Sequence, residues 1–226
     1  MHVILMGAQG SGKGTQAERL VPQLHLEHLS TGNLFRAAMA AETALGRQIK
    51  PIYDHGDLIP DDITLRLVEE QLEEIAEARR QEDGPRGALF DGFPRTRAQA
   101  EGLGALLTDR AEHIAIVVEI QVPTEVLVRR LAGRRVCSKC GATYHVDFDP
   151  PKQPGVCDRC GGELLQRADD TPEGVQRRLD LYFEQTAPLL AYYRERELLV
   201  SIDGNRPVDD VTADIVHALG LGAAAS

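Results

Sequence analysis

A glycine-rich loop near the N-terminus combines residue types that bind polyphosphate. Residues 7–15 (GAQGSGKGT) follow an apolar run that predicts a short buried strand, and they precede a predicted helix. Glycines let backbone N–H groups turn inward because they carry no Cβ, and a helix N-terminus adds unpaired donors and partial positive charge. Lys13 can reach the β- and γ-phosphates. We therefore predict that this loop binds a nucleoside triphosphate rather than forming a turn that binds nothing.

Two further motifs present an arginine beside features that hold phosphate or metal. In residues 30–36 (STGNLFR), hydroxyls and a helix N-terminus precede Arg36, so this segment can hold a second phosphate. In residues 90–96 (FDGFPRT), Asp91 ends a predicted buried strand, as a magnesium-organising carboxylate would, and a turn then presents Arg95. Each motif alone has a simpler alternative, a capped helix for the first and a surface salt bridge for either arginine.

Four cysteines form two C-x-x-C pairs with the spacing of a zinc site. The pairs are Cys137 with Cys140 and Cys157 with Cys160. Four thiolates fill the tetrahedral shell of Zn²⁺, so the metal would be structural. Two disulfides or four free thiols are the alternatives, and a reducing compartment disfavours disulfides. Basic and acidic residues balance over residues 133–170, so this segment has no patch for nucleic acid.

The elements that must position these motifs alternate between strands and helices, which indicates a parallel sheet covered by helices. The predicted strands are residues 3–6, 26–29, 88–90, 115–120 and 199–202. The predicted helices are residues 15–24, 34–41, 62–80, 97–109, 124–131, 172–196 and 208–219. Residues 30–59 and 133–170 interrupt this rhythm. We interpret both as insertions that close over ligands at the carboxyl ends of the strands.

Composition narrows the range of functions further. The chain has 226 residues and a formal net charge of −10, which argues against non-specific nucleic-acid binding. It lacks an apolar stretch of the length that a membrane span or a signal peptide needs. From the sequence alone we therefore expect a cytoplasmic protein with neither a membrane nor a nucleic acid as its partner.

Taken together, the motifs resemble the adenylate kinases of the long-lid bacterial type, whose lid binds zinc. The resemblance covers nearly the whole chain, and residues 91–96 (DGFPRT) are among its most specific motifs. A hydroxyl two places after the loop lysine, as in Thr15, is typical of nucleoside monophosphate kinases. Residues 133–136 (GRRV) match the family's entry into the lid, residues 167–170 (RADD) its exit, and residues 176–179 (QRRL) a helix that returns an arginine to the site.

The resemblance implies an α/β fold of the P-loop NTPase type. A five-stranded parallel sheet flanked by helices would form the core, from residues 1–29, 60–132 and 171–226. An inserted helical domain, residues 30–59, would bind AMP, and a zinc-ribbon-like lid, residues 133–170, would close over ATP. Because both insertions must move freely, we expect a monomer.

The resemblance also implies a reaction and the residues that serve it. ATP would transfer its terminal phosphoryl group reversibly to AMP, giving two ADP, with Mg²⁺ bound to ATP and Zn²⁺ in the lid. ATP would contact Gly10, Ser11, Gly12, Lys13, Gly14, Thr15, Arg130, Arg134, Thr143, Tyr144 and Arg206. AMP would contact Thr31, Arg36, Asp57, Leu58, Ile59, Gly92, Phe93, Pro94, Arg95, Gln99, Arg167 and Arg178. The catalytic residues would be Lys13, Asp91, Arg95, Arg134, Arg167 and Arg178, and the zinc ligands would be Cys137, Cys140, Cys157 and Cys160.

Three residues depart from the family pattern, and one of them, Asp57, is acidic where some relatives have Lys. Gln9 stands where the family usually has Pro, and Asn33 where it usually has an Asp associated with the water shell of Mg²⁺. The competing interpretations are a UMP or CMP kinase, whose lid is usually short and free of cysteine, and a phosphotransferase that prefers GTP. A P-loop protein with a nucleic-acid-binding zinc ribbon is a third, which the balanced charge of residues 133–170 disfavours.

Overall fold

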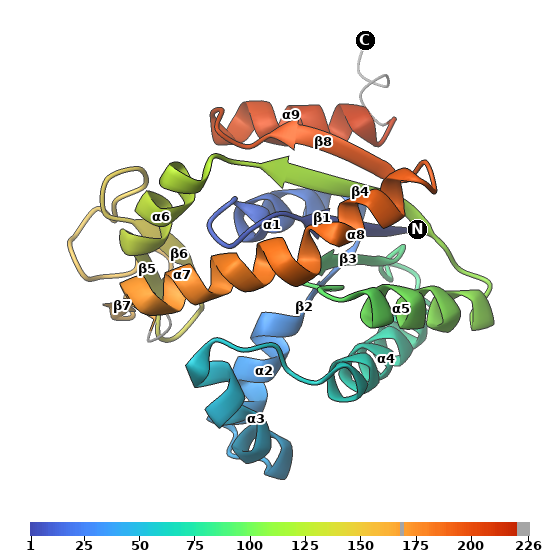
Figure 1. Cartoon of the computed structure of the whole chain (residues 1–226). Coiled ribbons are helices and arrows are strands. Elements are labelled where there is room, and N and C mark those ends of the chain that lie inside the picture. Colours follow the sequence, from blue (N-terminus) through green and yellow to red (C-terminus); the bar gives the residue numbers. More distant parts are fainter. Residues whose placement is uncertain (168–169, 221–226) are drawn as a thin grey trace.

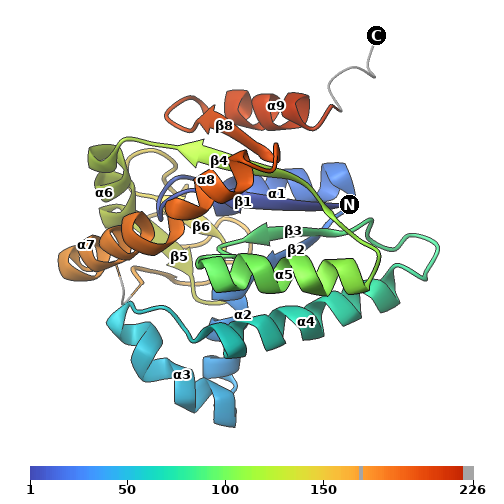
Figure 2. The ribbon, with the colours of Figure 1, turned by 45° about the vertical axis from the view of Figure 1, so that its right-hand side comes forward.

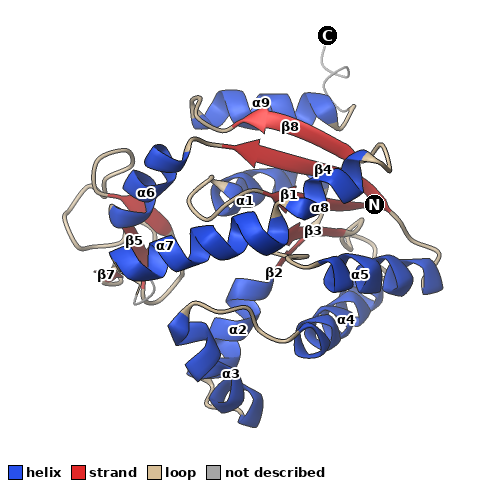
Figure 3. Ribbon diagram, viewed as in Figure 1, coloured by secondary structure: helices blue, strands red, loops and turns tan. Residues whose placement is uncertain are grey.

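A five-stranded parallel sheet forms the centre of the protein. The computed structural model describes residues 1–167 and 170–220, so Ala168 and Asp169 of the predicted lid exit lie outside the described residues. The strand order is β2-β3-β1-β4-β8, with every neighbouring pair parallel. The strands are β1 (His2–Met6), β2 (Glu27–Ser30), β3 (Ala88–Asp91), β4 (Ile114–Gln121) and β8 (Leu199–Asp203) (Figure 3). The predicted fold class is confirmed.

Helices cover both faces of this sheet because alternate residues of each strand point to opposite faces. Val3 and Leu5 of β1 pack against α1 and α9, whereas Ile4 of β1 and Phe90 of β3 belong to the core under α4, α5 and α8. Figure 2 shows α4 and α5 side by side on that second face. The helices are α1 (Lys13–Leu24), α4 (Asp61–Ala78), α5 (Arg97–Asp109), α8 (Pro188–Arg194) and α9 (Val208–Ala218).

The predicted helix 172–196 is not one regular helix. It comprises α7 (Pro172–Leu181), a π-helical turn (Tyr182–Thr186) and α8. Pro188 has no N–H to donate to the preceding turn, and the Ala187 N–H instead reaches back five residues to the Tyr182 carbonyl at 2.8 Å. The π-helical turn contacts the cleft, because the Thr186 hydroxyl donates to the Arg95 carbonyl at 2.9 Å.

The first insertion is a pair of helices below the sheet (Figure 1). Helix α2 (Thr31–Ala40) begins three residues earlier than predicted, and α3 (Ala44–His55) was not predicted at all. Pro51 lies inside α3, a position that disfavours a helix locally. Burial decides in its favour, because Ile49 packs into a cluster with Phe35 and Ile63.

The second insertion follows α6 (Thr124–Ala132) and is built on a small antiparallel sheet at the left of Figure 1. Its strand order is β6-β5-β7, formed by β5 (Arg134–Cys137), β6 (Thr143–His145) and β7 (Leu164–Leu165). A short buried cluster of Ala142, Tyr144, Leu164 and two cysteines is its core. Within residues 1–167 and 170–220, no helix combines the length and apolar character needed to cross a membrane.

Candidate active site

A cleft of about 1090 Å³ lies at the carboxyl ends of the central strands, between the two insertions. Parallel α/β sheets bind ligands at this edge. The structure brings together along this cleft every residue predicted to bind nucleotide. They are Gly10, Ser11, Gly12, Lys13, Gly14, Thr15, Thr31, Arg36, Asp57, Leu58, Ile59, Asp91, Gly92, Phe93, Pro94, Arg95, Gln99, Arg130, Arg134, Thr143, Tyr144, Arg167, Arg178 and Arg206.

The glycine-rich loop joins β1 to α1 and needs its glycines. Gly10 and Gly12 have φ values of 85° and 102°, in the region that L side chains rarely adopt. Lys13 folds back over this loop, where Nζ donates to the carbonyls of Gly7 at 2.7 Å and Ala8 at 2.9 Å. Burial, reinforced by the neighbouring arginines, lowers the pKa of Lys13 to about 8. The ammonium is therefore partly desolvated, and an anion beside it would stabilise its charged form.

Asp91 lies beside this loop at the end of β3. Its Oδ2 is 3.5 Å from Nε2 of His28, and a Cβ on Gly14 would lie 3.7 Å from the same oxygen. Burial alone would raise the pKa of Asp91, but the contact with His28 and the charge of Lys13 outweigh it and lower the pKa. The carboxylate is therefore ionised and available to a cation.

Arginines from separate elements converge on the middle of the cleft. Arg95 follows β3, Arg134 begins β5 and Arg178 lies on α7. Asp170, 2% exposed, joins two of them: its Oδ2 accepts from Nε of Arg134 at 2.8 Å, and its Oδ1 from Nη1 of Arg178 at 3.2 Å. Asp170 was not predicted as a site residue, although it belongs to the lid-exit motif. It fixes two guanidinium groups without reaching the cleft lining itself.

At the first insertion, the cleft has the polar groups of an anion site. The Thr31 hydroxyl donates to the Gly92 carbonyl at 3.0 Å. Arg36 donates to the Tyr53 hydroxyl at 2.6 Å and to the side-chain oxygen of Asn33. Asn33, which departs from the family pattern, therefore orients Arg36 in this structure.

At the opposite end, the cleft meets the second insertion and the start of α9. Arg130 donates to the Gly204 carbonyl at 3.0 Å, and Arg206 pairs with Asp210 at 3.4 Å and with Asp214. The Tyr144 hydroxyl accepts from the Asp158 N–H at 2.9 Å, so this group stabilises the insertion rather than facing a ligand.

Exposed ion pairs join both insertions to the core. Arg159, between the cysteines of the second pair, contacts Glu18 of α1 at 2.7 Å. Arg177 of α7 contacts Asp57 in the first insertion, and Nδ1 of His55 lies 2.6 Å from the same carboxylate. His55 and Arg177 lower the pKa of Asp57. The Asp57 carboxylate is therefore engaged by two basic side chains of the protein.

The four cysteines gather in the second insertion, away from the cleft lining. Their sulfurs lie within 4.8 Å of one another, with Cys137 and Cys160 at 3.5 Å and Cys140 and Cys157 at 3.6 Å. A tetrahedral zinc with Zn–S bonds of about 2.3 Å separates its sulfurs by about 3.8 Å, so the cluster has nearly the required size. The Lys139 N–H points at the Cys137 sulfur, which favours the thiolate. The donor set therefore fits structural zinc.

A polyphosphate loop, a second anion site and converging arginines define a phosphotransferase of the P-loop class that works on two phosphorylated substrates. A sequence model of the adenylate kinase family matches residues 5–198. Adenylate kinases of Bacillus subtilis (strain 168) and Bacillus pumilus (strain SAFR-032) are 48% and 49% identical to this chain, each over 97% of it and 98% of their own length. That of Bacillus cereus (strain AH187) is 49% identical over 97% of this chain and 99% of its own.

The chain belongs to the adenylate kinase family. Its activity is that of an ATP:AMP phosphotransferase, and its substrates are adenine nucleotides. The prediction of family, fold class and enzyme class is confirmed.

Proposed function

We propose that the cleft binds ATP and AMP at opposite ends and transfers the terminal phosphoryl group reversibly between them, which balances the cell's adenine nucleotides. The convergence of Lys13, Arg95, Arg134 and Arg178 between the two ends carries this proposal. Phosphoryl transfer requires alignment of two anions and neutralisation of charge in the transition state. The phosphate of AMP is already ionised, so the reaction needs no general base.

ATP lies along the glycine-rich loop under the second insertion. The backbone N–H groups of residues 10–15 and the Lys13 ammonium hold its phosphates, as the loop chemistry requires. The base and ribose lie between the Arg130–Arg206 side of the cleft and the Thr143–Tyr144 hairpin, all of which line it.

AMP lies at the first insertion. Arg36 and Arg95 bind its phosphate, because planar guanidinium groups match phosphate oxygens in pairs. Thr31, the backbone of residues 57–59 and 92–94, and Gln99 surround the base and ribose. Arg167 and Arg178 bridge the phosphates of both substrates.

Magnesium fits the edge of the loop where Asp91 and Thr15 lie. Both residues line the cleft, and the depressed pKa of Asp91 keeps its oxygens charged. Carboxylate, hydroxyl and phosphate oxygens are the ligands that Mg²⁺ takes beside nucleotides. When bound, the ion would neutralise part of the charge on the phosphates.

Replacing Asn33 by Asp is expected to change the magnesium dependence of the rate. Asn33 now accepts from Arg36, and a carboxylate there would add the charge that the family places near the metal's water shell. We expect half-maximal activity at a lower magnesium concentration in N33D. Titration of initial rate against free Mg²⁺ checks this, and superimposable curves for the two proteins would contradict it.

The three parts of the chain have different functions. Residues 1–29, 60–132 and 171–226 form the core, residues 30–59 bind AMP, and residues 133–170 are the lid. Closure of the lid excludes water, which otherwise competes as phosphoryl acceptor. Zinc held by Cys137, Cys140, Cys157 and Cys160 replaces the large apolar core that so small a lid lacks. The enzyme acts as a monomer, since both insertions move.

Variants that weaken the binding of one substrate and not of the other test the assignment of AMP and ATP to the two ends of the cleft. Arg36→Ala is expected to raise the KM for AMP about tenfold or more, the value of one hydrogen bond to a charged group, and to leave the KM for ATP within about twofold. Arg206→Ala is expected to raise the KM for ATP alone, by a smaller factor, because Arg206 already pairs with Asp210 and Asp214. Steady-state ADP formation measures both.

The same assay, run with UMP, CMP and GMP and without any monophosphate, sets the substrate class. A large rate only with AMP, and little loss of ATP in its absence, is the expected result. ATP hydrolysis that no monophosphate changes would overturn the arginine assignments.

A further inference from the structure

The amide of Gln99 is held in one orientation by partners of opposite kind. Gln99 is 2% exposed yet lines the cleft. Its Oε1 accepts from the backbone N–H of Arg95 at 2.8 Å, and its Nε2 donates to Oδ1 of Asp61 at 2.7 Å. The backbone N–H can only donate and the ionised carboxylate can only accept, so the two partners together determine which atom of the amide is oxygen.

Asp61 is itself held in place at the start of α4. The same Oδ1 accepts from the Thr96 hydroxyl at 3.0 Å, and the Thr96 oxygen in turn accepts from the Gln99 N–H at 3.2 Å as the cap of α5. Rotating the Gln99 amide by half a turn would place Oε1 against the Asp61 carboxylate and Nε2 against the Arg95 N–H. Both hydrogen bonds would become repulsions.

An amide held in one orientation can distinguish adenine from guanine, because the two bases exchange hydrogen-bond donor and acceptor at the same positions of their edges. Adenine presents an amino donor at the position where guanine presents a carbonyl acceptor. In the observed orientation Gln99 has one N–H and one oxygen lone pair beyond those that Asp61 and Arg95 use. An amide held in this orientation can hydrogen-bond to the donor and acceptor arrangement of one base and meets repulsion from that of the other.

We propose that Asp61 is a positioning residue that sets the preference for AMP over GMP by locking the Gln99 amide. Asp61 acts through Gln99 and does not touch the base. The proposal rests on the proposed contact between Gln99 and the base of AMP.

The test is the ratio of kcat/KM for AMP to that for GMP. In Asp61→Ala we expect this ratio to fall about tenfold, with the KM for ATP unchanged, because only the Arg95 N–H then opposes rotation of the amide toward guanine. In a Gln99→Ala background the same substitution should change the ratio by less than about twofold, since its effect requires the amide. Both rates come from one preparation, so any unfolded fraction cancels from the ratio.

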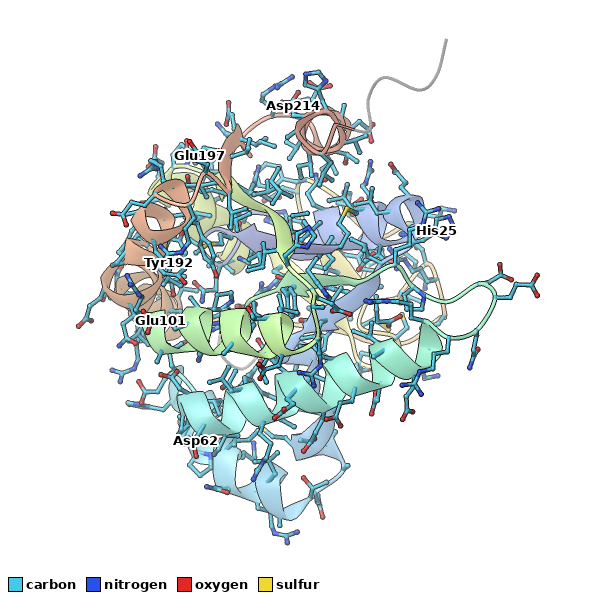
Figure 4. All side chains as sticks on the ribbon, turned by 90° about the vertical axis from the view of Figure 1, so that its right-hand side faces the viewer. His25, Asp62, Glu101, Tyr192, Glu197 and Asp214 are labelled. Carbon is cyan, nitrogen blue, oxygen red and sulfur yellow. The ribbon has the colours of Figure 1, made fainter. Side chains whose placement is uncertain are left out.

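Two variants serve as controls. Asp61→Asn keeps a carbonyl oxygen able to accept both hydrogen bonds, so it should preserve the ratio to within about twofold. Asp62→Ala removes the neighbouring carboxylate, which is exposed at the same end of α4 (Figure 4), and should change nothing. This variant reports the loss of a charge from the first helical turn alone.

The outcomes distinguish the positioning role of Asp61 from the contact between Gln99 and the base of AMP. A Gln99→Ala variant with altered AMP kinetics beside an Asp61→Ala variant of unchanged selectivity would overturn the positioning role and leave the base contact standing. Unchanged AMP kinetics in Gln99→Ala would overturn both. Equal and additive losses in the two backgrounds would assign Asp61 to structure only.

Discussion

Replacing Lys13 by methionine is expected to lower turnover roughly a thousandfold or more while leaving the protein folded. Lys13 Nζ lies in the loop that cradles phosphate, and methionine matches the length of its stem without the charge. The substitution removes a partly desolvated cation, which favours the folded state, and also two hydrogen bonds to loop carbonyls, which opposes it, so thermal stability should change little. Single-turnover ADP formation together with a melting curve measures both effects. Retention of a tenth of the activity would show that the ammonium is not central to transfer.

The pH dependence of the same residue supplies an internal check. With a pKa of about 8 in the empty site, Lys13 loses its proton as pH rises through 8, and the neutral amine attracts phosphate poorly. The value of kcat/KM for ATP should therefore fall about tenfold per pH unit above that point. Bound phosphates favour the ammonium, so kcat should hold to higher pH. In Lys13→Arg the decline of kcat/KM should shift upward, because a guanidinium stays charged.

Removing the metal is expected to lower the melting temperature by about 10 °C or more. Zinc binding by four thiolates contributes on the order of 10 kcal/mol to folding of small domains, and the lid has only a short apolar cluster besides. Initial turnover at low temperature should fall less, because the four cysteines lie outside the cleft lining. Calorimetry and rate measurements before and after chelation, under reducing conditions, provide the comparison.

Cys157→Ser and re-addition of zinc complete this experiment. The variant should melt like the chelated protein, and zinc should restore the wild-type curve but not that of the variant. Melting curves that coincide with and without chelator would argue against a structural metal.

Features that depend on short spacing were predictable from the sequence. The glycine-rich loop and the two cysteine pairs each carry their chemistry within a few contiguous residues, and the strand before the loop is apolar over residues 3–6. The existence of the sheet and of most helices was predicted for the same reason, with boundaries that differ by no more than three residues.

Features that depend on tertiary contacts were not predictable. Helix α3 contains Pro51, and only the burial of Ile49 against distant residues favours it. Asp170 joins Arg134 across 36 positions, and Asp61 joins Gln99 across 38, so no local pattern announces either pair. The Thr43 side chain that caps the start of α3 and Gly56 at its C-terminal end were the local signals available for that helix.

The exposed ion pairs that join the insertions to the core bear on how easily the enzyme changes shape. Pairs of this kind contribute about 0.2–1 kcal/mol each, so Arg159 with Glu18 and Arg177 with Asp57 alter the populations of joined and separated arrangements by no more than about fivefold apiece. Dissolved salt weakens them further. These two pairs therefore do little to hold the insertions against the core, and a small part of the nucleotide-binding free energy suffices to overcome them.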